Sequence, residues 1–111
     1  MTVTVTNIIP AKQVEASQTT QYTSTNCKTI IDKFTVTNTT AANVLFSANL
    51  VPSGGSATTG NLIIQTRAVA PQETYPCPEL VGQVLESGGF ISTLAGTVSA
   101  LTLSAAGRQV T

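Results

Sequence analysis

Two neighbouring runs of alternating side chains, Lys28–Asn38 and Asn43–Leu50, constrain the fold more than any other part of the sequence. In the second run every second residue from Val44 onward is apolar, and this two-residue period is typical of a half-buried strand. In the first run the apolar side changes between Ile31 and Phe34. A β-bulge there would restore the register, because one extra residue moves the following side chains to the other face. We therefore predict that the two runs form the central hairpin of a β-sandwich.

Further short runs of the same kind follow along the chain, bounded by glycine, proline or asparagine. We expect strands at residues 2–9, 20–25, 61–69, 90–95 and 98–104. Segment 79–86 has an apolar side, but Gly82 disfavours a helix, so we expect a helical turn or an irregular segment. Gly107 is expected to allow one last bend. About seven or eight short strands without strand–helix alternation predict an all-β fold, an antiparallel β-sandwich of jelly-roll type.

The amino-terminal stretch, residues 1–10, has two interpretations. Threonine and valine alternate and then run into Ile8 and Ile9, so the stretch is either the first strand or an extended arm that pairs with a neighbouring subunit. Pro10 is expected to end it, because proline has no amide hydrogen for a ladder. A length of 111 residues suits one domain and is short for two, so residues 1–111 are interpreted as a single domain.

Composition argues against several classes of partner. Charged residues make up 9% of the chain and the net charge is zero, with the basic residues scattered over Lys12, Lys28, Lys33, Arg67 and Arg108. Such a chain cannot neutralise a run of phosphates, so we expect neither nucleic acid nor a membrane as partner. A free-standing domain has about 25% charged residues, whereas this surface relies on hydroxyl and amide groups, including 20 threonines. It suits a protein packed against neighbours; a plain threonine-rich β-domain is the alternative.

The sequence also indicates a cytoplasmic origin. No stretch reaches the ~20 apolar residues that a membrane helix needs, and the N-terminus lacks the basic and apolar regions of a secretory signal. We therefore expect the protein to be made in the cytoplasm, unless a signal has already been removed. Because that compartment is reducing, Cys27 and Cys77 are interpreted as free thiols, with one disulfide between them as the alternative.

The residue types needed for catalysis are scarce. The chain has no histidine, and two cysteines alone are too few ligands for a closed zinc site. Glu73 and Glu79 flank a proline-rich segment and are interpreted as solvated loop residues, not as a glycosidase pair. We expect no enzymatic activity, no cofactor, no metal and no small-molecule substrate. Asp32 either pairs with a basic residue across the sheet or lies at a subunit contact. The interpretation that we favour is a charge at the bulge that discourages wrong strand pairing.

Three segments together resemble a small virion protein of tailed bacteriophages: Ile31–Asn38 (IDKFTVTN), Leu50–Gly55 (LVPSGG) and Cys77–Leu85 (CPELVGQVL). The chain is most similar, over roughly residues 20–110 and in its length and strand content, to the capsid decoration, or stapling, proteins of epsilon-fifteen-like short-tailed phages. The resemblance implies a jelly-roll domain bound outside an icosahedral shell of major capsid protein. It also implies homodimers that bridge neighbouring capsomers and stabilise the DNA-filled shell.

For such a protein we expect contacts at the borders of the sandwich, where strands can be added. The predicted capsid or subunit contacts are Val3, Val5, Ile8 and Ile9 near the N-terminus, Gly54 and Gly55 in the loop at 52–60, and Arg108 and Val110 in the tail at 108–111. Two other functions remain open. One is a neck, tail or fibre-base component of the virion, and the other is a carbohydrate-binding sandwich that would stack sugars on Tyr22 or Tyr75.

Overall fold

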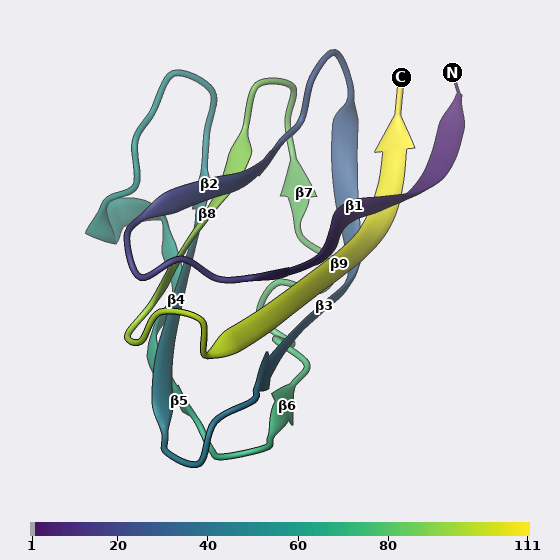
Figure 1. The fold of residues 1–111 in the computed structure, drawn as a ribbon. Helices are drawn as coiled ribbons and strands as arrows, with labels where there is room; N and C mark the ends of the chain where they lie inside the picture. Colours follow the sequence, from purple (N-terminus) through teal and green to yellow (C-terminus); the bar gives the residue numbers. More distant parts are fainter. Residues whose placement is uncertain (1) are drawn as a thin grey trace.

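The computed structural model describes residues 2–111, and within them the chain forms nine β-strands and one short 3₁₀ turn (Figure 1). The strands are β1 (Val3–Gln13), β2 (Thr19–Thr23), β3 (Lys28–Asn38), β4 (Val44–Val51), β5 (Leu62–Val69), β6 (Thr74–Tyr75), β7 (Val84–Leu85), β8 (Phe90–Ala95) and β9 (Leu101–Val110), and the 3₁₀ turn η1 covers Thr59–Asn61. No helix in the described residues is long and apolar enough to span a membrane.

The strands form two antiparallel sheets with jelly-roll connectivity. One sheet has the order β1-β9-β3-β6, with β7 also paired to β3, and the other has the order β2-β8-β4-β5. Apart from β7, the first strand pairs with the last, the second with the last but one, and so inward along the chain, which is the nested pairing of a jelly roll. The predicted all-β sandwich is therefore confirmed. The two additional strands, β6 and β7, are only two residues long.

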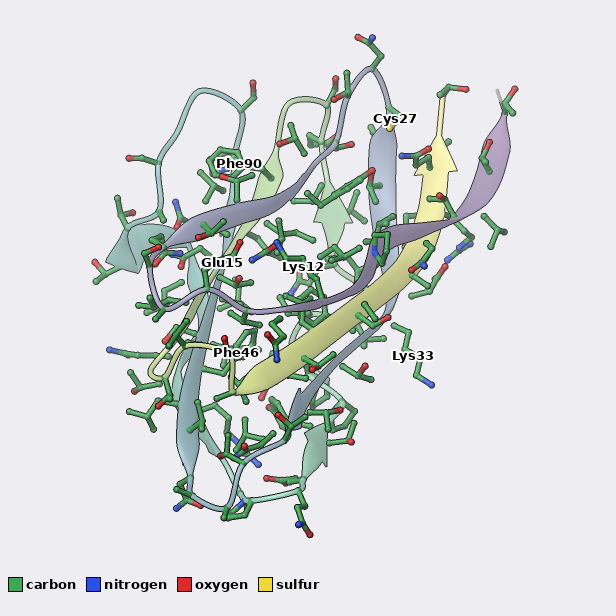
Figure 2. All side chains as sticks on the ribbon, in the orientation of Figure 1. Lys12, Glu15, Cys27, Lys33, Phe46 and Phe90 are labelled. Atoms are coloured by element: carbon green, nitrogen blue, oxygen red, sulfur yellow. The ribbon has the colours of Figure 1, made fainter. Side chains whose placement is uncertain are left out.

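The hydrophobic core fills the space between the sheets (Figure 2). Phe34 of β3 and Phe46 of β4 are fully buried, and their ring centroids lie 6.4 Å apart with the ring planes tilted by 42°. Burying a side chain of this size stabilises a fold by roughly 1.5–3 kcal/mol. The two rings come from opposite sheets, so they hold the layers together.

The predicted central hairpin is wrong, because β3 and β4 lie in different sheets. The link between them is shaped by Asn38, whose buried side-chain amide donates to the carbonyls of Ala42, at 2.7 Å, and Val69, at 2.9 Å. This link carries the chain from one layer to the other. Each strand still buries one face, but the two faces meet across the core instead of lying side by side.

The bulge predicted in β3 is present. The register against β9 shifts between Ile31, which pairs with Gly107, and Lys33, which pairs with Ala106. Asp32 is the additional residue. Because of this insertion, both Ile31 and Phe34 point into the core, and both are completely buried.

The N-terminal stretch is the first strand of the chain's own sheet. β1 pairs with β9 along its length, with register shifts between Thr6 and Ile9 and between Ile9 and Lys12. Pro10 does not end the strand, contrary to expectation. It lies on an edge strand and within the second irregularity, where a missing amide hydrogen is tolerated.

Gly107 lies within β9 and does not make the expected bend. A Cβ atom at this position would be 2.3 Å from the carbonyl oxygen of Ile30 on β3. Glycine is needed here because the two backbones approach each other closely at the bulge.

The remaining segments follow the sequence pattern closely. β2, β5 and β8 lie where strands were expected, whereas β9 begins at Leu101, because Ser99 has a positive φ of 56° in the turn before it. Residues 79–83 form turns that lead into β7, as an irregular segment was predicted to do. Cys27 and Cys77 are buried and unbonded, in agreement with the free-thiol interpretation.

Candidate interaction surfaces

The outer face of the sheet at the N-terminal end of β1 carries a group of exposed apolar side chains. Gln109 of β9 points inward, because its side-chain amide donates to the Tyr22 hydroxyl of the opposite sheet at 2.8 Å. Its neighbours on β9 therefore point outward, and so do the residues paired with them. We call this group the valine patch, and it consists of Val3, Val5, Ile30, Val84 and Val110.

The exposed fractions show which members of the valine patch are available to a partner. Val3 is 51% exposed, Val5 79% and Val84 49%, while Ile30 and Val110 are half-buried. Val5 and Ile30 each pair with Arg108, so this charged side chain lies between the valines of β1 and Val84 of β7. Exposed apolar groups bordered by polar residues often mark an interaction site. The predicted contacts at Val3, Val5 and Val110 thus lie together on one surface. Ile30 and Val84 were missed, because only the strand pairing brings them next to β1.

The edge of β1 beside this patch is open. Thr2 and Thr111 exchange two backbone hydrogen bonds, of 3.1 and 2.9 Å, and backbone groups along an antiparallel edge strand alternate in direction. The amide and carbonyl of Thr4 therefore point toward β9, and those of Val3 and Val5 point away from it. No other strand in the described residues pairs with this side of β1.

Two of the predicted contact residues are not on the surface. Ile8 and Ile9 are 7% and 1% exposed and belong to the core, which corrects the expectation that they contact a partner. The bulge between Thr6 and Ile9 explains this, because it changes which face of the strand is buried. β1 therefore consists of an exposed half and an anchored half.

The loop predicted to carry contacts lies at the same end of the molecule as the two termini (Figure 1). A turn closed by a 3.0 Å hydrogen bond from the Gly55 amide to the Pro52 carbonyl forms its first part. Gly54 has a positive φ of 79° in this turn. Both glycines follow β4 of the other sheet, so they are separate from the valine patch.

The charged groups within and beside the valine patch form ion pairs with each other. Arg108 lies against Asp32, with Nε 3.2 and 3.0 Å from the two carboxylate oxygens and Nη2 3.0 Å from Oδ1. This contact raises the pKa of Arg108. Lys28 and Glu86 form a second, looser pair at 3.6 Å. Asp32 thus pairs across the sheet, the alternative that the sequence interpretation did not favour, while also lying at the bulge.

The opposite edge of the same sheet, beyond β3, is closed. Tyr75 of β6 donates a hydrogen bond to Glu79, and the Arg67 guanidinium lies 4.3 Å from the centre of the Tyr75 ring. Burial, followed by the contact with Glu79, raises the pKa of Tyr75 to about 12. Burial likewise raises the pKa of Cys77 to about 12, while the hydrogen bond from Tyr75 lowers that of Glu79. These groups hold segment 75–79 against the sandwich and leave the Cys77 thiol protonated.

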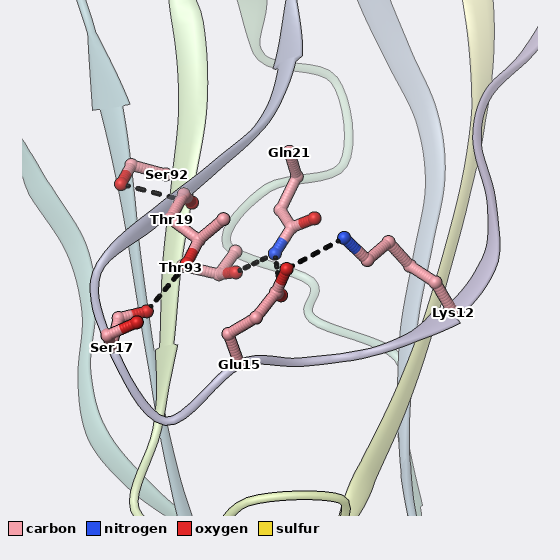
Figure 3. A network of polar contacts seen from close by, with 7 residues as sticks. All are labelled: Lys12, Glu15, Ser17, Thr19, Gln21, Ser92 and Thr93. Carbon is pink, nitrogen blue, oxygen red and sulfur yellow. Dashed lines mark hydrogen bonds and ion pairs between the residues drawn. The ribbon is translucent and has the colours of Figure 1, made fainter.

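A polar network fixes the connection between β1 and β2 (Figure 3). The Gln21 amide donates to Glu15 and to the Thr93 hydroxyl, at 2.9 Å each, and Lys12 lies 3.1 Å from the other oxygen of Glu15. The hydrogen bonds from Gln21 and then Lys12 lower the pKa of Glu15. The network is a structural brace that holds the anchored half of β1 to the opposite sheet.

The outer face of the second sheet contains an uncharged groove of about 330 Å³, lined among others by Gln18, Asn49, Thr58 and Thr66. Its polar groups are largely used internally: the Asn49 amide donates to the Thr58 carbonyl at 2.9 Å and to Asn61 at 2.8 Å. Neither Tyr22 nor Tyr75 lines the groove. The groove was missed from the sequence, where an asparagine inside a strand was its only signal.

Acidic side chains do not gather in one place on this molecule. In the described chain no three His, Cys, Asp or Glu side chains are grouped so that they could hold a metal ion. Glu15, Asp32, Glu79 and Glu86 each contact a different partner residue, and Glu73 accepts a hydrogen bond from the Ala70 amide. No family model, curated protein or solved structure matches this chain.

Proposed function

We propose that this chain is a structural virion protein that binds the outside of an icosahedral phage capsid and staples neighbouring capsid subunits together, so that the DNA-filled shell is stabilised. Its partners are the major capsid protein and a second copy of itself. The jelly roll supports the proposal, because the resemblance implies this fold and viral capsid domains often use it. Because one fold serves many functions, the argument rests on the surface.

The observation that carries the proposal is the open edge of β1 beside the valine patch. A stapling protein performs no chemical step, and it needs a rigid platform with borders that other subunits can cover. The unpaired backbone groups of Val3 and Val5 are available for strand addition. Covering exposed valine side chains favours association by about 25 cal/mol for each Å² of apolar area removed from water.

The charge distribution supports binding through apolar and backbone contacts. Six of the ten charged side chains form ion pairs within the molecule. Pairs that are already neutralised do not attract a charged partner over long distances. We expect binding to the shell to change little between low and physiological salt, because screening acts on unpaired exposed charges. Sedimentation of shells with bound protein at several salt concentrations measures this, and a steep loss of binding with salt would contradict it.

Many weak contacts are sufficient for this function. A shell presents the same surface in many symmetric copies, and a dimer that bridges two capsomers binds each of them at a high effective concentration. A modest contact at each site is therefore multiplied. Rupture of the shell would require several such bridges to open together, which is how a passive protein resists internal pressure.

The proposal is tested by adding the purified protein to shells of its own phage that lack it. We expect saturable binding to the exterior, at hundreds of copies per shell, and a higher temperature of DNA release. Val3→Lys should weaken binding. Val98→Lys should not, although it changes a valine in the turn before β9 that is even more exposed, at 67% against 51% for Val3. Failure to bind the shell would reject the proposal. Saturation at about a dozen copies would instead indicate a neck component, as expected from the lower symmetry of that part of the virion.

A further inference from the structure

The open half of β1 has a sequence that reads the same in both directions. Residues 2–6 are Thr, Val, Thr, Val and Thr, symmetric about Thr4. Any strand that pairs antiparallel with its own copy around a two-fold axis at position 4 sets position 3 opposite position 5. Here this places Val3 opposite Val5 of the second copy and Thr4 opposite Thr4, so valine meets valine and threonine meets threonine. Such a contact is isologous, with the same surface used on both sides.

The directions of the backbone groups agree with this register. In an antiparallel ladder, directly opposite residues alternate between pairs that exchange two hydrogen bonds and pairs that exchange none. The groups of Val3 and Val5 point away from β9, as the reciprocal bonds between Thr2 and Thr111 require. In the register centred on Thr4, these two valines are the residues that face each other across the copies. Each Val3–Val5 pair would exchange two hydrogen bonds, and Thr4 would form the pair without them.

Charge does not oppose the pairing. Residues 2–11 contain no ionisable side chain, and the nearest charged groups on β9 and β3, Arg108 and Asp32, neutralise each other at 3.0 Å. Natural edge strands usually avoid pairing by means of lysine, proline or an inward charge. The open half of β1 has none of these; Pro10 and Lys12 lie beyond it, in the anchored half.

We infer that the β1 edge pairs antiparallel with β1 of a second copy around a two-fold axis at Thr4, so that two sandwiches share one continuous sheet. The valines at positions 3 and 5 of both copies then form one apolar cluster on the common outer face. This inference deepens the proposed homodimer and rests on that part of the proposed function alone, since it holds in solution without a shell. The contact is small compared with a standard interface of roughly 1,600 Å², so the dimer in solution is weak and depends on concentration.

A cysteine at the axis tests the register directly. In a pair without hydrogen bonds the Cα atoms lie about 4.5 Å apart, which is within the range for a disulfide. Under mild oxidation Thr4→Cys should therefore form a covalent dimer. Thr2→Cys is the matched control, because four residues separate the two copies of position 2 along the strands, roughly 13 Å. The native cysteines are buried and should not react in the folded protein.

Sedimentation equilibrium over a concentration series completes the experiment. We expect the full-length protein to show a monomer–dimer equilibrium, Val5→Lys to weaken it by at least about tenfold through like charges brought together at the axis, and Val98→Lys to leave it unchanged. The inference is overturned if the wild-type protein stays monomeric at every concentration, if Val5→Lys dimerises like the wild type, or if Thr4→Cys forms no more covalent dimer than Thr2→Cys. Shell binding is measured separately, so a failure here rejects the β1 pairing and the homodimer, while binding to the capsid is judged by its own test.

Discussion

The sheet built from β1, β9 and β3 has one edge that is covered by other segments and one edge that is not. Beyond β3 the edge is covered by β6, β7 and the turns between them, where Gly82 donates to the Ile31 carbonyl at 2.7 Å and Ile31 donates to Gln83 at 3.0 Å. At the other edge, residues 3–6 of β1 pair with β9 on one side, and no strand in the described chain pairs with their other side. A free edge is a template for further strand pairing. Of the two edges of this sheet, the one at β1 has no covering segment, and this is where we expect a partner.

Substitutions of buried residues in the segment that covers the β3 edge should strongly destabilise the protein. Leu80 is completely buried under the covering segment, whereas Val81 beside it is 44% exposed. We expect Leu80→Ala to lower the free energy of unfolding by about 2–5 kcal/mol through lost burial and a residual cavity. Val81→Ala should change it by less than about 0.5 kcal/mol. Urea denaturation of both variants measures the difference, and similar losses would show that the segment is not anchored as described.

Strand β9 lies between the two edges, and a substitution of its Gly107 should destabilise the protein nearly as much. Gly107→Ala would place a Cβ atom 2.3 Å from the Ile30 carbonyl oxygen, so β9 and β3 would have to separate at the bulge. We expect a loss of about 1–3 kcal/mol or more, the usual range for overpacking. Thermal unfolding monitored by circular dichroism provides the comparison with the wild type. A variant as stable as the wild type would mean that the backbones are not in close contact there.

The closed edge should also respond to alkaline pH. The folded-state pKa of Tyr75 is raised from its ordinary value of 10 to about 12, so the fold favours the neutral phenol. This contribution to stability is fully present below pH 10 and is lost as the pH rises through 12. We expect Tyr75→Phe to lose less stability than the wild type between pH 10 and 12, as measured by urea denaturation. The same variant should lack the late ultraviolet phenolate step, and retention of that step would contradict the assignment to Tyr75.

Substitutions at the open edge of β1 should change the stability of the protein less than substitutions elsewhere in the sheet. Val5 is 79% exposed, and substitutions at such positions usually change stability by less than about 0.5 kcal/mol. Val5→Thr should therefore unfold like the wild type, because threonine also favours a strand. Hydrogen exchange should show fast exchange at the amides of Val3 and Val5 in dilute solution and slow exchange at Ile31. A large loss of stability in Val5→Thr would mean that this half of β1 belongs to the core.

The fold class was predictable because the alternation of single strands survives in the structure, as in β9, where buried and partly buried residues alternate from Leu101 to Gly107. Partner strands were not predictable in the same way. A strand with one buried face looks the same in sequence whether the next strand lies beside it or across the core, and this is why β3 and β4 were wrongly paired. Gly107 is a second example, because a glycine permits both a bend and a close approach of two backbones.

Exposure of the proposed contact residues was predictable only where it follows local alternation. Val3 and Val5 alternate with threonine, and the structure places both on the outside. Ile8 and Ile9 are adjacent, and only the bulges in β1 explain why both are buried. Ile30 and Val84 join the valine patch through pairing between strands far apart in the chain, which no local pattern encodes.

Electron cryo-microscopy of phage particles that carry this protein tests the central claim most directly. The proposed function predicts density for the jelly roll in many symmetric copies on the outer surface of the shell, with the valine patch and the β1 edge covered by neighbouring subunits. Particles that lack the protein on the shell, or bound copies whose β1 edge and valine patch all face solvent, would contradict it.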